Sequence, residues 1–181
     1  AARVSGLHPI RLNTVLLKGR NEDEIMDFVR FVERYPDTLQ LLFIEYMPFE
    51  QRRFKTVSAE TLRERLAEQF TLEPVQQSLT TKGPARSVRI AETGLMVGFI
   101  SPLSEHFCAT CNRLRLMADG NLRTCLAHED TPSLRDLIRA GYSDTALAES
   151  IQAMVLGKPV GHDCQITGGR LFEGTMTAIG G

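Results

Sequence analysis

Three cysteines in the second half of the chain have the spacing of ligands to one metal centre. Cys108, Cys111 and Cys125 follow the pattern C-x2-C-x13-C. Two cysteines three residues apart can bind one centre from the same turn, and a third can reach it from an adjoining strand. The spacing therefore predicts a metal site, although it does not select the metal.

The residues between the second and third cysteines predict a β-hairpin. Polar and apolar residues alternate over 112–117 and 122–125, and an Asp119-Gly120 pair separates the two runs. Such alternation around Asp-Gly is typical of two antiparallel strands joined by a tight turn. The hairpin would return Cys125 to the other two cysteines, so a small antiparallel sheet is expected to carry the metal site.

Two arginines on the first strand of this hairpin are candidates for phosphate binding. Because side chains alternate between the faces of a strand, Arg113 and Arg115 are expected on one face and Leu114 and Leu116 on the other. Guanidinium groups bind phosphate oxygens through two parallel hydrogen bonds. The alternative interpretation is a solvated strand face with ordinary surface charge.

The residue types leave two kinds of metal centre open. An iron-sulfur cluster usually takes four cysteines, so three would leave one iron without a protein thiolate. An open iron beside two arginines would be a substrate site. A structural zinc site instead needs a fourth ligand. The candidates for that ligand are His106, His128, His162 and Cys164.

Several runs of sequence together resemble one enzyme family. They are S-E-H-F-C-A-T-C-N-R-L-R (104–115), C-L (125–126), S-L-R-D (133–136) and I-G-G (179–181). With them the chain resembles the GTP 3',8-cyclase family, also called molybdenum cofactor biosynthesis protein A, which belongs to the radical S-adenosylmethionine enzymes. The similarity covers essentially all 181 residues and is weakest over 50–91 and 161–177.

The resemblance implies a substrate site at the three cysteines. Cys108, Cys111 and Cys125 would hold a second [4Fe-4S] cluster, against which GTP binds through its guanine. The residues implied to bind GTP at this end are Arg113, Leu114 and Arg115. His162 and Cys164 have no counterpart in the family pattern and are therefore expected not to be ligands.

Four further positions match family residues. Arg11, in Arg-Leu-Asn, stands where the family usually has a lysine that contacts the nucleotide triphosphate, and Met47 matches a residue that lines the S-adenosylmethionine site. Gly180 and Gly181 match the tail that activates the family's enzymes. Without the resemblance these would be a strand arginine, a core methionine and a frayed end.

The resemblance also implies the reaction. The family's enzymes use S-adenosylmethionine and a first [4Fe-4S] cluster to convert GTP to 3',8-cyclo-7,8-dihydro-GTP, the first step of molybdenum cofactor biosynthesis. No residue here is implied to initiate the radical, because the family's N-terminal C-x3-C-x2-C motif does not occur in this chain. The chain thus resembles only the C-terminal part of this lyase, and alone it is expected to be inactive.

Two accounts of that partial resemblance follow. In the first, the chain is a truncated product or expressed fragment; in the second, which is rarer, it is one half of a split protein. In either case the N-terminal barrel portion would act with it, in cis or in trans. The resemblance also allows a homodimer. The alternative function is a non-catalytic, zinc-stabilised binding module.

The expected fold is α/β, with an incomplete TIM-type barrel followed by a small α+β domain. Residues 1–55 would form the last βα units of the radical S-adenosylmethionine barrel. They contain a strand over 10–17, a helix from an Asn21–Glu24 capping box to Pro36, and a strand over 39–47 whose apolar run is typical of burial on both faces.

Residues 56–181 would form the cluster and GTP-binding domain, ending in a glycine-rich tail. Its expected elements are a helix capped by Ser58 and reaching Phe70, a hairpin over 87–91 and 95–100, a helix opened by Thr131-Pro132 and stopped by Gly141, and a helix from Ser143 to Leu156. Leu134, Leu137, Ile138, Leu147, Ile151, Met154 and Val155 would face inward over the hairpin sheet.

Composition narrows the partners. With 43% hydrophobic residues the chain can bury a core. Its 21 basic and 22 acidic side chains nearly balance, so no broad positively charged surface for binding a nucleic acid is expected. No apolar run is long enough to span a membrane, and the first residues lack the core of a signal peptide. The clustered cysteines favour a reducing cytoplasm.

Overall fold

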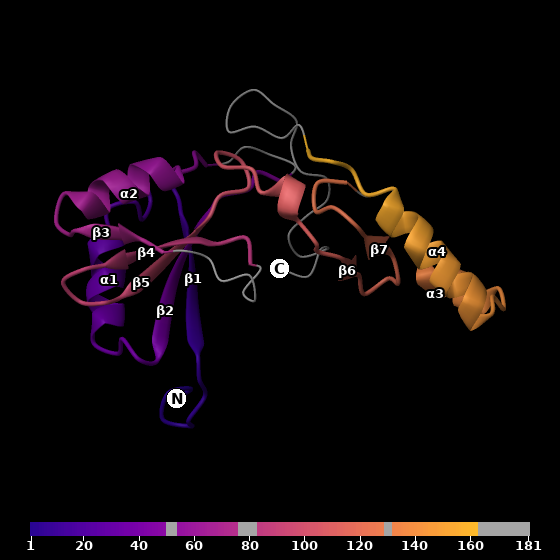
Figure 1. Cartoon of the computed structure of the whole chain (residues 1–181), viewed down its shortest axis with the longest axis horizontal. Helices are drawn as coiled ribbons and strands as arrows, with labels where there is room; N and C mark the ends of the chain where they lie inside the picture. Colours follow the sequence, from indigo (N-terminus) through magenta and orange to yellow (C-terminus); the bar gives the residue numbers. More distant parts are fainter. Residues whose placement is uncertain (50–53, 76–82, 129–131, 163–181) are drawn as a thin grey trace. The chain divides into compact units, whose positions relative to one another are not determined.

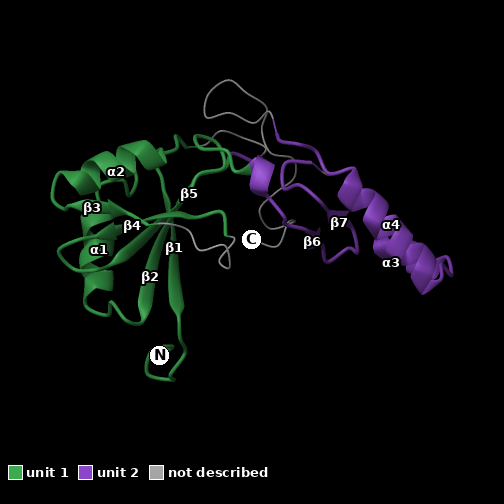
Figure 2. Ribbon diagram, viewed as in Figure 1, with its two compact units in different colours: residues 1–47, 54–107 green, residues 48–53, 108–181 purple. Residues whose placement is uncertain are grey.

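The structure, a computed structural model, describes residues 1–49, 54–75, 83–128 and 132–162. Figure 1 shows their helices and strands. The chain divides into two compact units, coloured separately in Figure 2: unit 1 contains residues 1–47 and 54–107, and unit 2 contains 48–53 and 108–181.

Unit 1 is built on a five-stranded mixed sheet. Its strands are β1 (Ile10–Leu16), β2 (Leu39–Glu45), β3 (Leu72–Pro74), β4 (Arg86–Ile90) and β5 (Met96–Ile100), in the order β1-β2-β5-β4-β3. β2 pairs in parallel with β1 and β5, whereas β4 pairs antiparallel with β3 and β5. The two strands predicted over 10–17 and 39–47 and the predicted hairpin are therefore confirmed.

One face of this sheet carries the hydrophobic core. The helices α1 (Ile25–Glu33) and α2 (Ala59–Ala67) pack there against the central strands. Phe43 and Phe99 are 1% exposed, and their ring centroids lie 6.2 Å apart. Burying side chains of this size contributes about 1.5–3 kcal/mol each, so this layer dominates the stability of unit 1.

The other face of the sheet is less buried, which corrects the expectation for the strand over 39–47. Burial along β2 alternates strictly, and Leu42 and Ile44 are only half-buried. In the described part of unit 1, α1 and α2 both contribute to the core on the first face. The second face of β1 and β2 is therefore not covered by α1 or α2 and could line a binding site.

The predicted capping box at the start of α1 is wrong. The Asn21 side chain accepts a hydrogen bond from the Leu17 N–H at 2.8 Å and donates one to the Val15 carbonyl at 3.2 Å. The amide therefore stabilises the end of β1, and α1 begins at Ile25 with no side-chain cap.

The predicted cap of α2 is confirmed. The Ser58 hydroxyl accepts a hydrogen bond from the Thr61 N–H at 3.2 Å. The helix ends at Ala67, earlier than predicted.

Unit 2 contains short elements around the cysteines. They are a 3-10 turn, η1 (Cys108–Thr110), the strands β6 (Arg115–Leu116) and β7 (Leu122–Arg123), and the helices α3 (Leu134–Arg139) and α4 (Asp144–Leu156). The predicted hairpin at Asp119-Gly120 is confirmed, with antiparallel pairing across the turn. Its strands are shorter than predicted, and Leu114 and Leu116 are 44% and 68% exposed.

The helices of unit 2 differ from prediction in two ways. Ser133, not Pro132, sets the start of α3, because its hydroxyl accepts a hydrogen bond from the Asp136 N–H at 3.3 Å. The predicted inward faces are only half-buried: neither α3 nor α4 contains a buried residue, and of the residues predicted to face inward Ile138 and Val155 are 60% and 41% exposed while the other five are partly buried. A sheet of two-residue strands is too small to cover two helical faces. The Ser143 cap of α4 is confirmed.

The coarse fold class is thus mixed α/β with a mixed sheet. β4 and β5, assigned from sequence to the second domain, share the sheet of β1 and β2; the domain boundary between residues 55 and 56 stays a prediction. No helix in the described ranges combines the length and apolar character required to cross a bilayer.

Candidate metal centre

The cysteine loop begins on η1. A hydrogen bond of 3.0 Å from the Cys111 N–H to the Cys108 carbonyl closes the turn that carries the first two thiols. Burial raises the pKa of the Cys108 thiol, the His162 backbone N–H opposes this shift, and the neighbouring Cys125 and Cys111 raise the pKa further. None of the three cysteines is in a disulfide. All three thiols are thus within electrostatic reach of one another.

The separation of these sulfurs bears on the type of metal. Zinc–ligand distances of about 2.0–2.3 Å place the ligand atoms of one tetrahedral ion within about 4 Å of one another. The three cysteines do not form a group within 4.8 Å; among described residues only His106, Cys108 and His162 do so. A cluster spreads its thiolates more widely because each binds a different iron. The three described cysteines are therefore not arranged as ligands of one shared ion.

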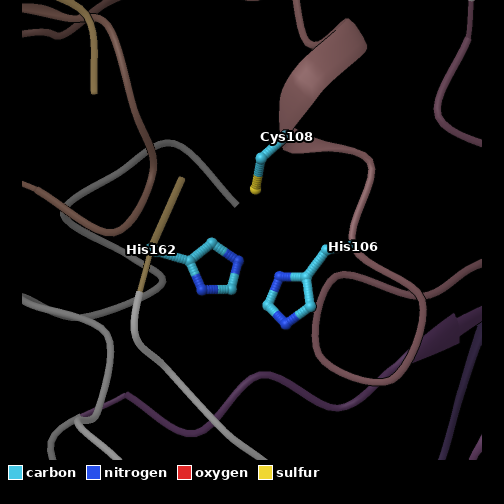
Figure 3. Close-up of side chains that lie close together, drawn as sticks. All are labelled: His106, Cys108 and His162. Carbon is cyan, nitrogen blue, oxygen red and sulfur yellow. The ribbon is translucent and has the colours of Figure 1, made fainter. Parts of the chain in front are cut away.

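Two histidines lie beside Cys108. Figure 3 shows the Cys108 sulfur pointing toward the imidazole rings of His106 and His162. His106 is separated from Cys108 by Phe107 alone, so their proximity follows from the chain itself. His162 comes from the segment after α4 and shares unit 2 with Cys108. Its position supports His162, one of the four zinc-ligand candidates named from the sequence, although the family pattern gives this residue no counterpart.

The remaining candidates for a fourth zinc ligand are placed differently. His128 lies in the turn after Cys125, where its N–H reaches the Cys125 carbonyl at 3.4 Å, and it is not a member of the close group. Cys164 lies outside the described residues.

Arginines gather next to the thiols. Burial lowers the pKa of Arg115, and the positive charges of Arg113 and Arg123 lower it as well, whereas Cys111 and Cys125 raise it. Like charges held together in a half-buried site favour the binding of an anion. The arrangement can therefore bind phosphate next to the cysteines.

Two basic residues close to the cysteines were not identified from the sequence. Arg123 is 8% exposed and lies directly opposite Arg115 in the hairpin; the register around Asp119-Gly120 could have identified it. The other is Lys158, whose ammonium donates to the Cys111 sulfur at 3.4 Å. No local signal marks it, because 47 residues separate the two partners.

The candidate residues of unit 1 lie at opposite ends of the sheet. Arg11 is the second residue of β1, and its Nε donates to the Gln40 Oε1 at 3.2 Å at the start of β2. Met47 lies two residues after the end of β2 and is half-buried. The structure does not bring these two side chains together. Gly180 and Gly181 lie outside the described residues.

The fold and the cysteine centre define a mixed α/β protein with a candidate metal site next to arginines. The model of the family Molybdenum Cofactor Synthesis C matches residues 39–164. This chain therefore belongs to that family.

Curated relatives agree with the family assignment. The chain is 41% identical over 189 residues to the GTP 3',8-cyclase of Pseudomonas putida (strain W619), covering 100% of this chain and 55% of the relative. It is 42% identical over 168 residues to that of Paracoccus denitrificans (strain Pd 1222), covering 90% and 47%. For Moorella thermoacetica the identity is 40% over 184 residues, covering 100% and 55%. The chain spans about half the length of these relatives.

Proposed function

We propose that this chain is the substrate-holding portion of a GTP 3',8-cyclase. That enzyme converts GTP to 3',8-cyclo-7,8-dihydro-GTP with S-adenosylmethionine, in the first step of molybdenum cofactor biosynthesis. The observation that carries the proposal is the arginine group beside the thiols: Arg123 lies opposite Arg115 in the hairpin, and burial, with the charges of Arg113 and Arg123, lowers the pKa of Arg115. Next to a metal centre, such a group suits a nucleoside triphosphate.

In this proposal Cys108, Cys111 and Cys125 hold a second [4Fe-4S] cluster. Support comes from the half-burial of the three cysteines and from the electrostatic influence of Cys125 and Cys111 on the Cys108 thiol. When bound, the cluster supplies one iron that lacks a protein thiolate and can bind a purine. The protein orients the nucleotide at that iron and keeps water away from it.

The phosphate end of GTP is assigned to Arg113, Leu114 and Arg115. Arg113 and Leu114 are exposed, and Arg115 is half-buried, so the run leads from solvent toward the thiols. A triphosphate would relieve the repulsion between the guanidinium groups. It would also accept hydrogen bonds that are stronger than neutral ones because both partners are charged.

Unit 1 is proposed to be part of the radical S-adenosylmethionine barrel. β1 and β2 pair in parallel, β1 is the edge strand of the described sheet, and the face that α1 and α2 leave uncovered carries Arg11 and Asn13. On that face Arg11 would contact the triphosphate in place of the family's lysine.

The remaining assignments extend this barrel. Met47 would line the S-adenosylmethionine site, and Gly180 and Gly181 would form the activating tail. The first cluster and the rest of the barrel would come from the N-terminal portion, in cis or in trans. The reducing cytoplasm, favoured by the clustered cysteines, is the proposed compartment.

The test is nucleotide binding to protein purified without oxygen. Wild-type protein is expected to contain iron and sulfide and to bind GTP, and Arg113→Ala and Arg115→Ala should each weaken binding about 10- to 100-fold, since a charged hydrogen bond contributes about 1.5–3 kcal/mol. Arg139→Met, an exposed change on α3, is the matched control. Unchanged GTP affinity in both site variants, measured by calorimetry, would remove the proposed role.

One observation favours a second candidate, a zinc-stabilised binding module without turnover. The ligand atoms of His106, Cys108 and His162 all lie within 4.8 Å of one another, and imidazole and thiolate are ligands that zinc prefers. A colourless protein with stoichiometric zinc and no affinity for GTP would favour this candidate over the cyclase.

A further inference from the structure

Residues 158–162, shortly after α4, are more buried than the helix itself. α4 ends at Leu156, and the Lys158 N–H turns back to the Val155 carbonyl at 3.2 Å. In the segment 158–162, which we call the post-helix segment, every residue except Val160 is half-buried, whereas most residues of α4 are exposed. The post-helix segment therefore packs against something that α4 does not reach.

Lys158 provides the first contact of this segment with the cysteine loop. Its Nζ donates to the Arg113 carbonyl at 2.9 Å and to the Cys111 sulfur at 3.4 Å. An ammonium group has three donors, so one side chain bridges a thiol and the backbone of a phosphate-binding residue.

Gly161 and His162 provide the second contact. The His162 backbone N–H donates to Cys108. A Cβ on Gly161 would lie 3.7 Å from the Cys108 Cβ and 3.9 Å from its sulfur, which is van der Waals distance. The two ends of the post-helix segment thus reach two different cysteines of the same loop.

We propose that the post-helix segment is a hydrogen-bonding cover of the metal centre, in which Lys158 raises the reduction potential of the cluster and fixes the position of Arg113. The inference rests on the proposed function insofar as the centre is an iron-sulfur cluster. Lys158 acts through Cys111 and through the Arg113 backbone, so it is a positioning residue.

The physical reason is electrostatic. Reduction adds one electron to a cluster whose thiolates already carry negative charge, and it breaks no bond. Hydrogen bonds to the sulfurs are among the factors that set cluster potentials, and partners of the ligands are known to tune metal centres. A cation donating to the Cys111 sulfur favours the reduced state, so its removal makes reduction harder.

The test compares Lys158→Met, Lys158→Arg and Arg139→Met in protein carrying the cluster. Mediated titration followed by electron paramagnetic resonance should give Lys158→Met a potential more negative by about 59 mV, a tenfold decrease in the one-electron reduction equilibrium. Lys158→Arg keeps a charged donor and should retain most of the wild-type potential. Arg139→Met removes a charge on α3, at the other end of unit 2 from η1 (Figure 1), and should change nothing.

A second measurement detects the hydrogen bond itself. Electron-nuclear double resonance in deuterated buffer should show exchangeable protons coupled to the wild-type cluster, with one coupling lost in Lys158→Met. Wild-type potential and wild-type couplings in Lys158→Met would overturn the inference. If that variant purifies without iron, Lys158→Gln replaces it: a lowered potential with retained iron supports the cover, and an unchanged potential overturns it.

The outcome is separable from that of the proposed function. Protein that holds the cluster but does not bind GTP contradicts the cyclase and leaves the effect of Lys158 on the potential measurable. Intact GTP binding with an unaltered potential in Lys158→Met contradicts only the cover.

Discussion

Unit 1 removes large apolar side chains from solvent, whereas the residues of unit 2 that the structure describes do so hardly at all. Phe43 and Phe99 in unit 1 are 1% exposed, but neither helix of unit 2 contains a buried residue. From Cys108 onward, the buried residues in the described part of the chain flank Cys125 closely. They are Leu122, Arg123, Thr124 and Ala127.

The contrast shows that the two units depend on different sources of stability. Burial of apolar area at roughly 25 cal/mol per Å² can stabilise unit 1. Such a core is absent from the described part of unit 2, and small domains of this kind commonly need a metal to fold. The predictions below test this contrast, in order of decreasing effect.

Removing a ligand of the metal centre should have the largest effect, confined to unit 2. Cys125→Ser is expected to abolish iron binding and hydrogen-exchange protection in unit 2, because metal binding can contribute about 10 kcal/mol to the folding of small domains. Amides of unit 1 should keep their wild-type protection. Cys164→Ser, which alters a cysteine expected not to be a ligand, is the control. Wild-type protection of unit 2 in Cys125→Ser would show that the centre does not stabilise this unit.

Removing a core side chain should destabilise unit 1. Phe43→Ala is expected to cost about 3–5 kcal/mol, the range for truncating a buried aromatic residue, measured by denaturant unfolding. Phe31→Ala is the matched control, because Phe31 is 47% exposed and its truncation leaves no closed cavity. Equal costs for the two variants would contradict the assignment of the core.

A substitution in the hairpin turn should affect unit 2 to an intermediate degree. Gly120 has a φ of +89°, and an added Cβ would overlap the Arg135 side chain and lie 3.2 Å from the Arg135 backbone nitrogen. Gly120→Ala should therefore cost about 2–3 kcal/mol and weaken metal binding. Gly141→Ala is the control: its φ is +81° with nothing within 4 Å of the added carbon, so only the backbone strain of about 1 kcal/mol applies. Similar metal affinity in both variants would argue against a tight turn at Gly120.

The smallest effect concerns an ion pair in unit 1. The hydrogen bonds from Arg63 lower the pKa of the Glu105 carboxyl, and one of them measures 2.8 Å. Because the folded pKa is depressed, the stabilisation is present above the unfolded pKa of about 4.3 and is lost as pH falls through the folded value.

Glu105→Gln tests this contribution. It should cost about 1 kcal/mol at pH 7, a value reduced by the 22% exposure of the Glu105 side chain, and its unfolding should depend less on pH below about 4. Glu64→Gln, an exposed change on α2, should keep the wild-type pH profile. A wild-type profile in Glu105→Gln would mean that the ion pair contributes nothing.

Local sequence signals predicted the parts of the fold that depend on neighbouring residues. Ser58 and Ser143 cap their helices as expected, and Asp119-Gly120 forms the hairpin turn. The predicted capping box failed because the side chain forms other hydrogen bonds: Asn21 binds the backbone at the end of β1 instead of capping α1.

The sequence by itself determined the strands β1, β2, β4 and β5 of unit 1, the hairpin and the family, because these follow from the backbone preferences and spacing of residues close together in the chain; the three-residue strand β3 was not predicted. Only the tertiary structure placed Arg123 opposite Arg115 in a buried position, His162 beside Cys108 and Lys158 on Cys111. The last two contacts join residues far apart in sequence, so they depend on the path of the whole chain and leave no local pattern.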